Sequence, residues 1–166
     1  MTEFLLRPLT AKNRDPALTV INTAARWYRE FLPAAAYHDP EMTPADWDVE
    51  TLRMTWFGAF LRRHLVGVMG LEYVRDVALL RHAYILPEYQ RRGVGSDLLN
   101  HLEAQVQGVS RILVGTYAGN YKARHALEKA GYRLAADSEA LLRTYYGIPE
   151  DRLRSSVTYE KLRQAP

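Results

Sequence analysis

The chain has 166 residues, the size of one ordinary domain rather than two. Its 48% hydrophobic and 25% charged residues are typical of globular proteins and argue against a disordered, collagen-like or low-complexity chain. The formal net charge of +3 is too small to indicate a nucleic-acid partner. We therefore expect a single domain over residues 1–166.

No apolar run approaches the roughly 20 residues that a membrane helix requires, and residues 1–10 lack the hydrophobic core of a signal peptide. The sequence thus predicts a soluble, cytoplasmic protein with no membrane partner. Because cysteine is absent, a disulfide framework, thiolate-bound zinc and a cysteine nucleophile are excluded. The five histidines are never three to five residues apart, so no metal site is expected.

Hydrophobic spacing predicts helices and strands that alternate along the whole chain. In the first half we expect a helix over 16–32 that Pro33 ends, a helix from Thr43 to about residue 54, and strands over 56–61, 65–73 and 77–86. In the second half we expect helices over 95–106, 120–130 and 138–146, and strands over 111–116, 132–135 and 155–162. The order of strand, helix and strand around residues 77–116 predicts a right-handed parallel crossover.

The most informative segment is Gln90-Arg91-Arg92-Gly93-Val94-Gly95, which joins the strand ending near Pro87 to an amphipathic helix. Two glycines permit a tight turn whose amide hydrogens point at an anion beside the positive end of the helix, and two arginines add charge. This pattern indicates a pyrophosphate-binding loop, with a plain strand-to-helix turn as the alternative. A dinucleotide fingerprint and a Gly-Lys-Ser/Thr triphosphate loop are both absent.

The same loop resembles the Gln/Arg-x-x-Gly-x-Gly/Ala signature of the GNAT superfamily of acyl-CoA N-acyltransferases. Downstream, Asn120, Ala123, Glu128-Lys129 and Gly131-Tyr132 are similar to a later motif of that family. The resemblance covers residues 65 to about 134 closely and the flanking helices loosely. It implies an α/β (α+β) GNAT fold: a central mixed sheet of six to seven strands with a splayed parallel pair, flanked by about four to five helices.

The resemblance also implies that acetyl-CoA is the cosubstrate and lies between the strands that end near Leu86 and Thr116. Carried over from the family, the pantetheine and thioester would meet main-chain groups of Ala83, Tyr84 and Ile85. The pyrophosphate would lie against Arg91, Arg92, Gly93, Val94, Gly95 and Ser96, and Asn120 and Ala123 would border the pantetheine and phosphate. The activity implied is direct acetyl transfer to a primary amine without an acyl-enzyme, which agrees with the absence of cysteine and of a Gly-x-Ser-x-Gly elbow.

The sequence departs from the family at the positions that handle protons. Many relatives have a tyrosine where this chain has Leu127, and some have a glutamate where it has Gly115. The usual general acid and base are therefore missing, and other groups must replace them.

Three residues are the candidate replacements: His82, Glu72 and Tyr145. An unperturbed histidine has a pKa near 6.5, suited to a base at neutral pH, but a lone strand histidine is also a common packed residue. Glu72 is either a second base or a solvated charge at a strand end. Tyr145 and its neighbour Tyr146 either donate a proton and line the acceptor pocket or pack in the core. Tyr117 either stacks near the pantetheine or ends its strand.

The acceptor is less well defined by the sequence. Between Arg29 and Arg53 all charged residues are acidic, which suggests either a negative lip that attracts a cationic amine or a solvated helix face. These acids are Glu30, Asp39, Glu41, Asp46, Asp48 and Glu50. Aromatic residues of the same region, Trp27, Tyr28, Tyr37 and Trp47, would form either a substrate floor or core. The sequence favours a small-molecule amine as acceptor; a protein amine, a binding module without turnover, a longer acyl chain and a homodimer stay open.

Overall fold

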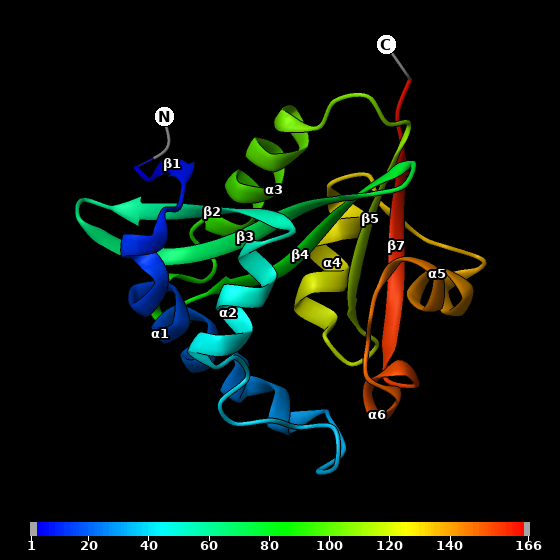
Figure 1. The fold of residues 1–166 in the computed structure, drawn as a ribbon, viewed down its shortest axis with the longest axis horizontal. Helices are drawn as coiled ribbons and strands as arrows, with labels where there is room; N and C mark the ends of the chain where they lie inside the picture. Colours follow the sequence, from blue (N-terminus) through cyan, green and yellow to red (C-terminus); the bar gives the residue numbers. More distant parts are fainter. Residues whose placement is uncertain (1–2, 165–166) are drawn as a thin grey trace.

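The computed structural model describes residues 3–164 and contains one open sheet with helices on both faces (Figure 1). Its seven strands lie in the order β1-β2-β3-β4-β5-β7-β6. They are β1 (Leu5–Pro8), β2 (Met54–Leu61), β3 (His64–Val74), β4 (Val77–Ile85), β5 (Arg111–Tyr117), β6 (Arg133–Leu134) and β7 (Ser156–Leu162). The mixed sheet implied by the family resemblance is thereby confirmed.

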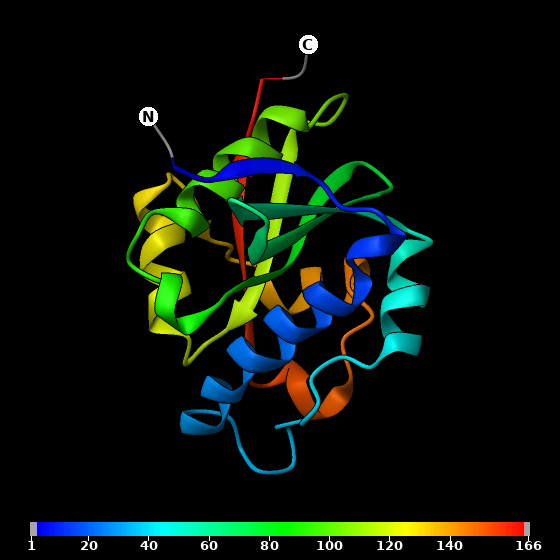
Figure 2. The same ribbon diagram turned by 90° about the vertical axis from the view of Figure 1, so that its left-hand side faces the viewer.

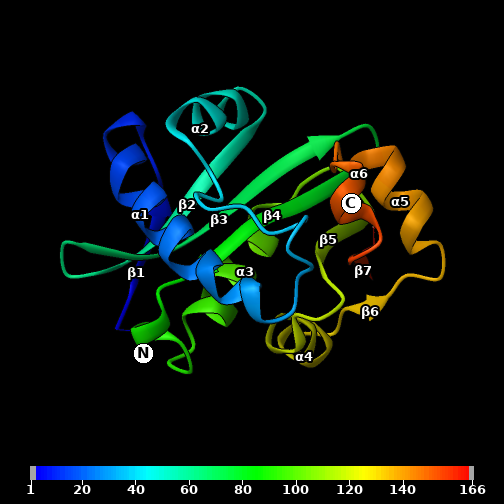
Figure 3. The ribbon, with the colours of Figure 1, turned by 90° about the horizontal axis from the view of Figure 1, so that it is seen from below.

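Six α-helices flank this sheet. They are α1 (Arg14–Ala25), α2 (Pro44–Thr51), α3 (Val94–Gln105), α4 (Tyr121–Lys129), α5 (Ser138–Tyr145) and α6 (Glu150–Leu153). Helices α1, α2 and α5 lie over one face and α3 and α4 over the other, as the turned views show (Figures 2 and 3). The strand side chains follow this division: Ala78 and Leu80 of β4 join the core under α3, while Leu79 joins the core under α5.

Strands β1 to β4 and β5 to β7 form two antiparallel halves, which meet at the parallel pair β4 and β5. Helix α3 connects the two parallel strands, as the crossover prediction required. The parallel pairing is short: Ala78, Leu79 and Leu80 pair with Ile112, Leu113 and Val114. Beyond Leu80 and Val114 the two strands run on without pairing, so the sheet opens between them.

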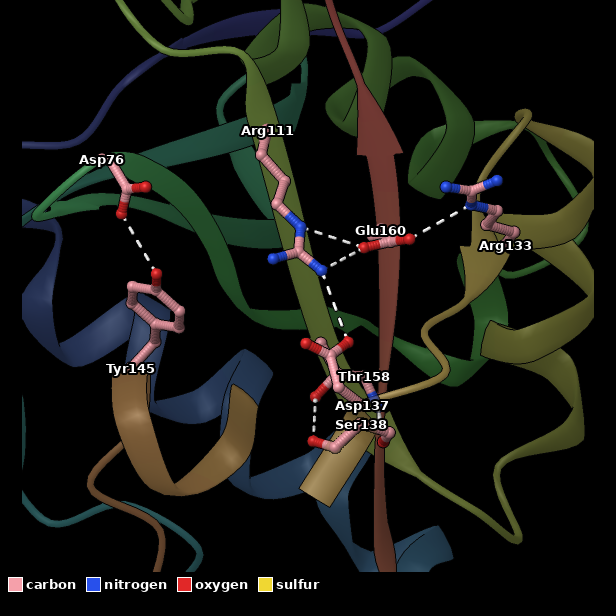
Figure 4. A network of polar contacts seen from close by, with 8 residues as sticks. All are labelled: Asp76, Arg111, Arg133, Asp137, Ser138, Tyr145, Thr158 and Glu160. Carbon is pink, nitrogen blue, oxygen red and sulfur yellow. Dashed lines mark hydrogen bonds and ion pairs between the residues drawn. The ribbon is translucent and has the colours of Figure 1, made fainter. Parts of the chain in front are cut away.

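Ion pairs to one buried carboxylate tie together the strands of the second half (Figure 4). Glu160 of β7 is only 7% exposed and accepts hydrogen bonds from Arg111 of β5 and Arg133 of β6. Ser138, at the start of α5, accepts a hydrogen bond from the backbone N–H of Thr158 at 2.8 Å. One carboxylate therefore satisfies cations from both neighbouring strands, an arrangement that offsets the cost of burying it.

Most predicted elements are confirmed, with shifts of one or two residues at their ends. The predicted capping role of Thr43 is confirmed, because its hydroxyl accepts from the backbone N–H of Asp46 at 3.1 Å. The first predicted helix is shorter: α1 ends at Ala25 and a 3-10 turn covers Arg26–Glu30. Strand β1 and the four-residue helix α6 were not predicted, which takes the helices beyond the expected four to five.

Among the described residues, no helix combines the length and the apolar character needed to cross a membrane.

Candidate active site

A β-bulge in β4 marks the point where the sheet opens. Tyr84 is opposite Val68 and Arg81 is opposite Gly70, so two residues of β4, His82 and Ala83, face the single residue between them on β3. His82 has a φ of 55°, a left-handed conformation that is uncommon outside glycine. Such strain is often found at functional sites, and here it lies directly beyond the last parallel pair.

Backbone groups of β4 are available on the open side. The N–H of Leu86 donates to the carbonyl of Val66 on β3, and backbone groups alternate in direction along a strand. The amide of Ile85 therefore faces away from β3, and its carbonyl accepts instead from Nε2 of Gln90 at 3.2 Å. The opening thus exposes strand edges of the kind that an extended, amide-containing chain such as pantetheine can pair with.

The glycine loop forms the amino-terminal end of α3, a helix of 12 residues. Gly93 is the N-cap in a left-handed conformation with a φ of 83°, and Arg91 also has a positive φ of 63°. Ser96 is exposed in the first turn, whereas Val94 is buried. The loop therefore leaves the unpaired first amides of α3 beside open space, as an anion site requires.

The two arginines of this loop behave differently. Arg92 is paired with the carboxylate of Glu3, and its guanidinium lies 5.6 Å from the ring centre of Phe4 and 5.3 Å from that of Tyr89. Arg91 is exposed, with no ion pair or hydrogen bond of its side chain among residues 3–164. Arg91 is thus the arginine that is free to contact a phosphate, while Arg92 is held toward the β1 side.

Asn120 lies at the far side of the opening, where β5 leads into α4. It is 8% exposed, and its Oδ1 accepts from the backbone N–H of Ala123 at 3.1 Å, which caps α4. The side-chain amide nitrogen has no hydrogen-bond partner among the described residues. The two family positions are therefore in contact, and the Nδ2 group of Asn120 remains available as a donor.

Charged side chains gather beside the bulge on the face covered by α1, α2 and α5. Arg81 donates to Glu72 at 2.8 Å and lies 3.5 Å from Glu50, and Arg53 pairs with Glu50 at 2.6 Å. His82 joins them, with its Nε2 3.5 Å from Oε2 of Glu50. Sequence reasoning named Glu50 only as one of a run of acids, because nothing local indicates that α2 brings it to β4.

The electrostatics of this cluster favour an ionised Glu50. Burial by itself would raise the pKa of Glu50, but the interaction with His82 and the charges of Arg81 and Arg53 outweigh it and lower the pKa to about 2. Glu50 is therefore a permanent anion at physiological pH. It can stabilise a positive charge on a neighbour, but it is too weakly basic to hold a proton itself.

The three catalytic candidates from the sequence lie in different places. His82 is at the bulge, and Glu72 is 7% exposed and bound to Arg81. Tyr145 lies elsewhere: its hydroxyl donates to Asp76 at 3.1 Å, in the turn at the paired end of β4 (Figure 4). The next residue, Tyr146, is at the opening, where its hydroxyl oxygen accepts from the N–H of Gly115 at 3.1 Å.

The structure shows what surrounds Gly115 and Leu127, the two positions that depart from the family motif. A Cβ at Gly115 would meet the Tyr146 ring at 3.4 Å, so the tyrosine occupies the space that a longer side chain at residue 115 would need. Leu127 is 6% exposed and belongs to the core on the α3 and α4 face. Tyr146 is thus the polar group that the structure supplies beside position 115, and burial raises its pKa, so it stays protonated.

Aromatic rings close the opening on the face opposite to α3. Tyr28 contacts Tyr84 of β4 at 5.9 Å and Tyr117 of β5 at 4.9 Å between ring centres, and Phe31 packs beside them. Behind them Arg152 binds Glu41 through two hydrogen bonds. Tyr28 and Trp47 are buried core residues, while Trp27 and Tyr37 are half-buried at the edge of the core. Of the two interpretations of these aromatic residues, core packing therefore describes Tyr28 and Trp47.

A negative lip was one of two interpretations of the acidic run between Arg29 and Arg53, and in the structure each of its six acids has a hydrogen-bond or ion-pair partner. Their partners are Trp27 for Glu30, Arg26 for Asp39, Arg152 for Glu41, the N-terminus of α2 for Asp46, Arg14 for Asp48, and Arg53, Arg81 and His82 for Glu50. Glu30 and Asp46 accept from neutral N–H groups, whereas the other four acids pair with cations, and Arg14, Arg81 and Arg152 reach theirs from segments at least thirty residues away.

Replacing Gly95 with alanine is expected to weaken acetyl-CoA binding about tenfold without lowering the free energy of unfolding. Gly95 lies in the first turn of α3, where its new Cβ would meet only Ile85, at 4.0 Å, and alanine favours a helix. A methyl group there would still obstruct the close approach of a pyrophosphate to the loop amides. Calorimetric titration with coenzyme A and urea unfolding measure the two effects.

The matched control is Gly93→Ala. Its Cβ would point into open space but would force a φ of 83° on alanine, so unfolding should become easier by about 1 kcal/mol. Unchanged coenzyme A affinity in both variants would contradict the assignment of the loop.

Comparison with known proteins agrees with this geometry. The family model described as the acetyltransferase (GNAT) family matches residues 21–132. The ribosomal protein bS18-alanine N-acetyltransferase of Escherichia coli (strain K12) is 28% identical over 140 residues, which are 80% of this chain and 92% of that protein. Among solved structures, the PaiA N-acetyltransferase from Thermoplasma acidophilum in complex with coenzyme A gives a TM-score of 0.72 at 17% identity and covers 96% of this chain and 98% of that one. A GNAT-family acetyltransferase from Staphylococcus aureus Mu50 gives 0.74 at 13% identity, with 97% and 99% covered.

A sheet opened at a parallel strand pair, with a glycine loop at the start of the connecting helix, is the arrangement that the family resemblance implies for an acyl-CoA-dependent acyltransferase domain. The chain belongs to the GNAT family of acetyltransferases. It is an acetyl-CoA-dependent N-acetyltransferase. The described residues fit the donor, because the outward-facing N–H of Ile85 and the first amides of α3 are the kind of groups that pantetheine and pyrophosphate need.

Proposed function

We propose that this enzyme moves the acetyl group directly from acetyl-CoA to a primary amine and that His82 takes the proton of that amine. The observation that carries the proposal is the position of His82: it lies in the bulge of β4, at the first residues beyond the paired part of the two parallel strands. A neutral imidazole is a base of suitable strength near pH 7.

The chemistry requires a proton acceptor and a proton donor. An amine attacks only as the free base, so the nitrogen-to-carbon bond forms as the amine proton passes to His82 and the carbon-to-sulfur bond breaks. The sulfur leaves as a thiolate that needs a proton. Tyr146 suits this role better than Tyr145, because its hydroxyl oxygen accepts from Gly115 at the opening and its own hydrogen stays free to donate.

Two classes of acceptor are candidates. The first is the amine of a small molecule, which reaches the opening from the face that carries Glu50, Tyr28 and Tyr117. The second is the amino terminus of a polypeptide, favoured by the 28% identical relative whose name gives a ribosomal protein alanine as its substrate. Both present a primary amine to the same reacting position, so the donor side of the site does not distinguish them.

Thiol release from acetyl-CoA, measured over two panels, separates these classes. One panel holds small amines, amino acids and aminoglycosides, and the other holds peptides of about six residues with varied first residues. We expect saturable release with one panel only, and mass spectrometry should place a single acetyl group on the amine. If lysine side chains are acetylated as fast as every amine of both panels, the enzyme has no specific acceptor site.

A further inference from the structure

Three buried polar atoms beside the bulge have no hydrogen-bond partner among residues 3–164. They are Oε2 of Glu50, Nε1 of Trp56 and Nε2 of His82, and they come from α2, β2 and β4. Orphaned polar atoms of this kind are rare in folded proteins and call for an explanation. Two of them, the carboxylate oxygen and the imidazole nitrogen, face each other at 3.5 Å. That separation suits an ion pair and needs only a small closure to become a hydrogen bond.

Aromatic packing fixes the histidine ring in this orientation. The indole of Trp56 lies against His82 with 5.5 Å between ring centres, and Trp47 stacks on the other side of Trp56 at 4.3 Å. Trp47 belongs to α2, the same helix as Glu50. Helix α2 therefore supplies both the carboxylate and part of the aromatic stack that holds the ring, so its role goes beyond covering the sheet.

We propose that Glu50 is the positioning residue of His82: its carboxylate accepts the hydrogen of Nε2 and leaves Nδ1 as the atom that takes the proton of the acceptor amine. This inference rests on the proposed function. It specifies the tautomer of His82 that the function needs, with the hydrogen on Nε2. A carboxylate that holds one imidazole nitrogen fixes the other as the acceptor and stabilises the cation formed after transfer.

The other charged and titratable groups near His82 do not take over the role of Glu50 as its acceptor. Arg53 comes from the segment after α2, Glu72 from β3, Arg81 from β4 and Tyr146 from the end of α5. Glu72 is held by Arg81 at 2.8 Å, and Arg53 lies 3.9 Å from the same carboxylate, so Glu72 and Glu50 share these two cations but only Glu50 also reaches His82. Glu50 is the only carboxylate among the described residues that lies within 4 Å of His82.

Replacing Glu50 with glutamine tests the proposal by two measurements. In the intact protein, nitrogen-15 nuclear magnetic resonance of the His82 ring at pH 8 should show hydrogen on Nε2 in the wild type and a smaller share of that tautomer in the variant, because a neutral amide is a weaker acceptor than a carboxylate. The kcat at pH 8 should fall about tenfold, because the tautomer with a free Nδ1 is less populated and the imidazolium has lost its counter-charge. The KM for acetyl-CoA should stay the same.

Asp48→Asn is the matched control, because it removes one charge from the exposed side of the same helix. It should leave both the tautomer of His82 and the kcat as in the wild type. If the glutamine variant is unstable, Glu50→Asp keeps the negative charge but moves it away from His82, and its share of the Nε2 tautomer and its kcat should fall between those of the wild type and Glu50→Gln.

The outcomes separate this proposal from the proposed function. A His82 tautomer population that is the same in the wild type and in Glu50→Gln overturns the positioning role, whatever the activity. A changed tautomer population with an unchanged kcat keeps the pairing but overturns the role of His82 as base, and with it the proposed proton transfer. A purely structural Glu50 would lower the melting temperature alone.

Discussion

The His82→Ala variant should transfer acetyl groups about a hundredfold more slowly than the wild type at pH 7.5, because a positioned general base contributes about a hundredfold or more. Its KM for acetyl-CoA should change less than about threefold, since the proposed donor site consists mainly of main-chain groups and does not include the imidazole. The acid limb of the rate profile, which reports the ionisation of the base, should disappear. Steady-state rates of thiol release between pH 5.5 and 9 measure all three quantities.

Two further variants separate chemistry from folding. His64→Ala removes an exposed histidine at the start of β3 and should leave the rate unchanged. His82→Gly should be at least as stable as His82→Ala, because glycine adopts a φ of 55° without strain, and it should be equally slow. Full activity in either His82 variant would remove this residue from the mechanism.

The Arg152→Met variant should lose about 3 to 5 kcal/mol of unfolding free energy, because it leaves the carboxylate of Glu41 buried without a counter-charge. The two side chains are 11% and 8% exposed, and their two hydrogen bonds measure 2.5 and 2.9 Å. Arg152 also donates to the carbonyl of Ala36 at 3.0 Å, which fixes the segment between α1 and α2 to α6. Urea unfolding followed by circular dichroism measures the loss.

A double variant distinguishes an unpaired charge from lost packing. Adding Glu41→Gln to Arg152→Met should recover more than half of the loss, because the buried anion is gone. Arg154→Met, an exposed arginine two residues away, should change the unfolding free energy by less than about 0.5 kcal/mol. A double variant as unstable as Arg152→Met would show that packing, and not the buried charge, carries the effect.

The sequence by itself determined the features that depend on neighbouring residues. Helical spacing, the cap at Thr43 and the glycine turn at Gly93 and Gly95 place α2 and α3 within about three residues of their true ends, because capping and periodicity act within one turn. The crossover from β4 to β5 follows from the order of elements alone. The family motif, read at Gly93 and Gly95, likewise identified the donor.

Short and sheet-edge elements could not be found in this way. Strand β1 has four residues, LLRP, and α6 has four, so neither carries enough periodicity to be recognised. Both exist because of distant partners: β1 pairs with β2 some fifty residues later, and α6 is anchored through Arg152 to Glu41.

The catalytic surroundings were decided only by the tertiary structure. The acids between residues 30 and 50 left a negative lip and a solvated helix face open, and only folding shows that Glu50 and Glu41 pair with the distant cations Arg81 and Arg152. Likewise, adjacent tyrosines are equivalent in the sequence, but the helix turn sends Tyr145 to Asp76 and Tyr146 to Gly115. Long-range pairing and burial set the charge and direction of these groups, and neither is encoded within a window of a few residues.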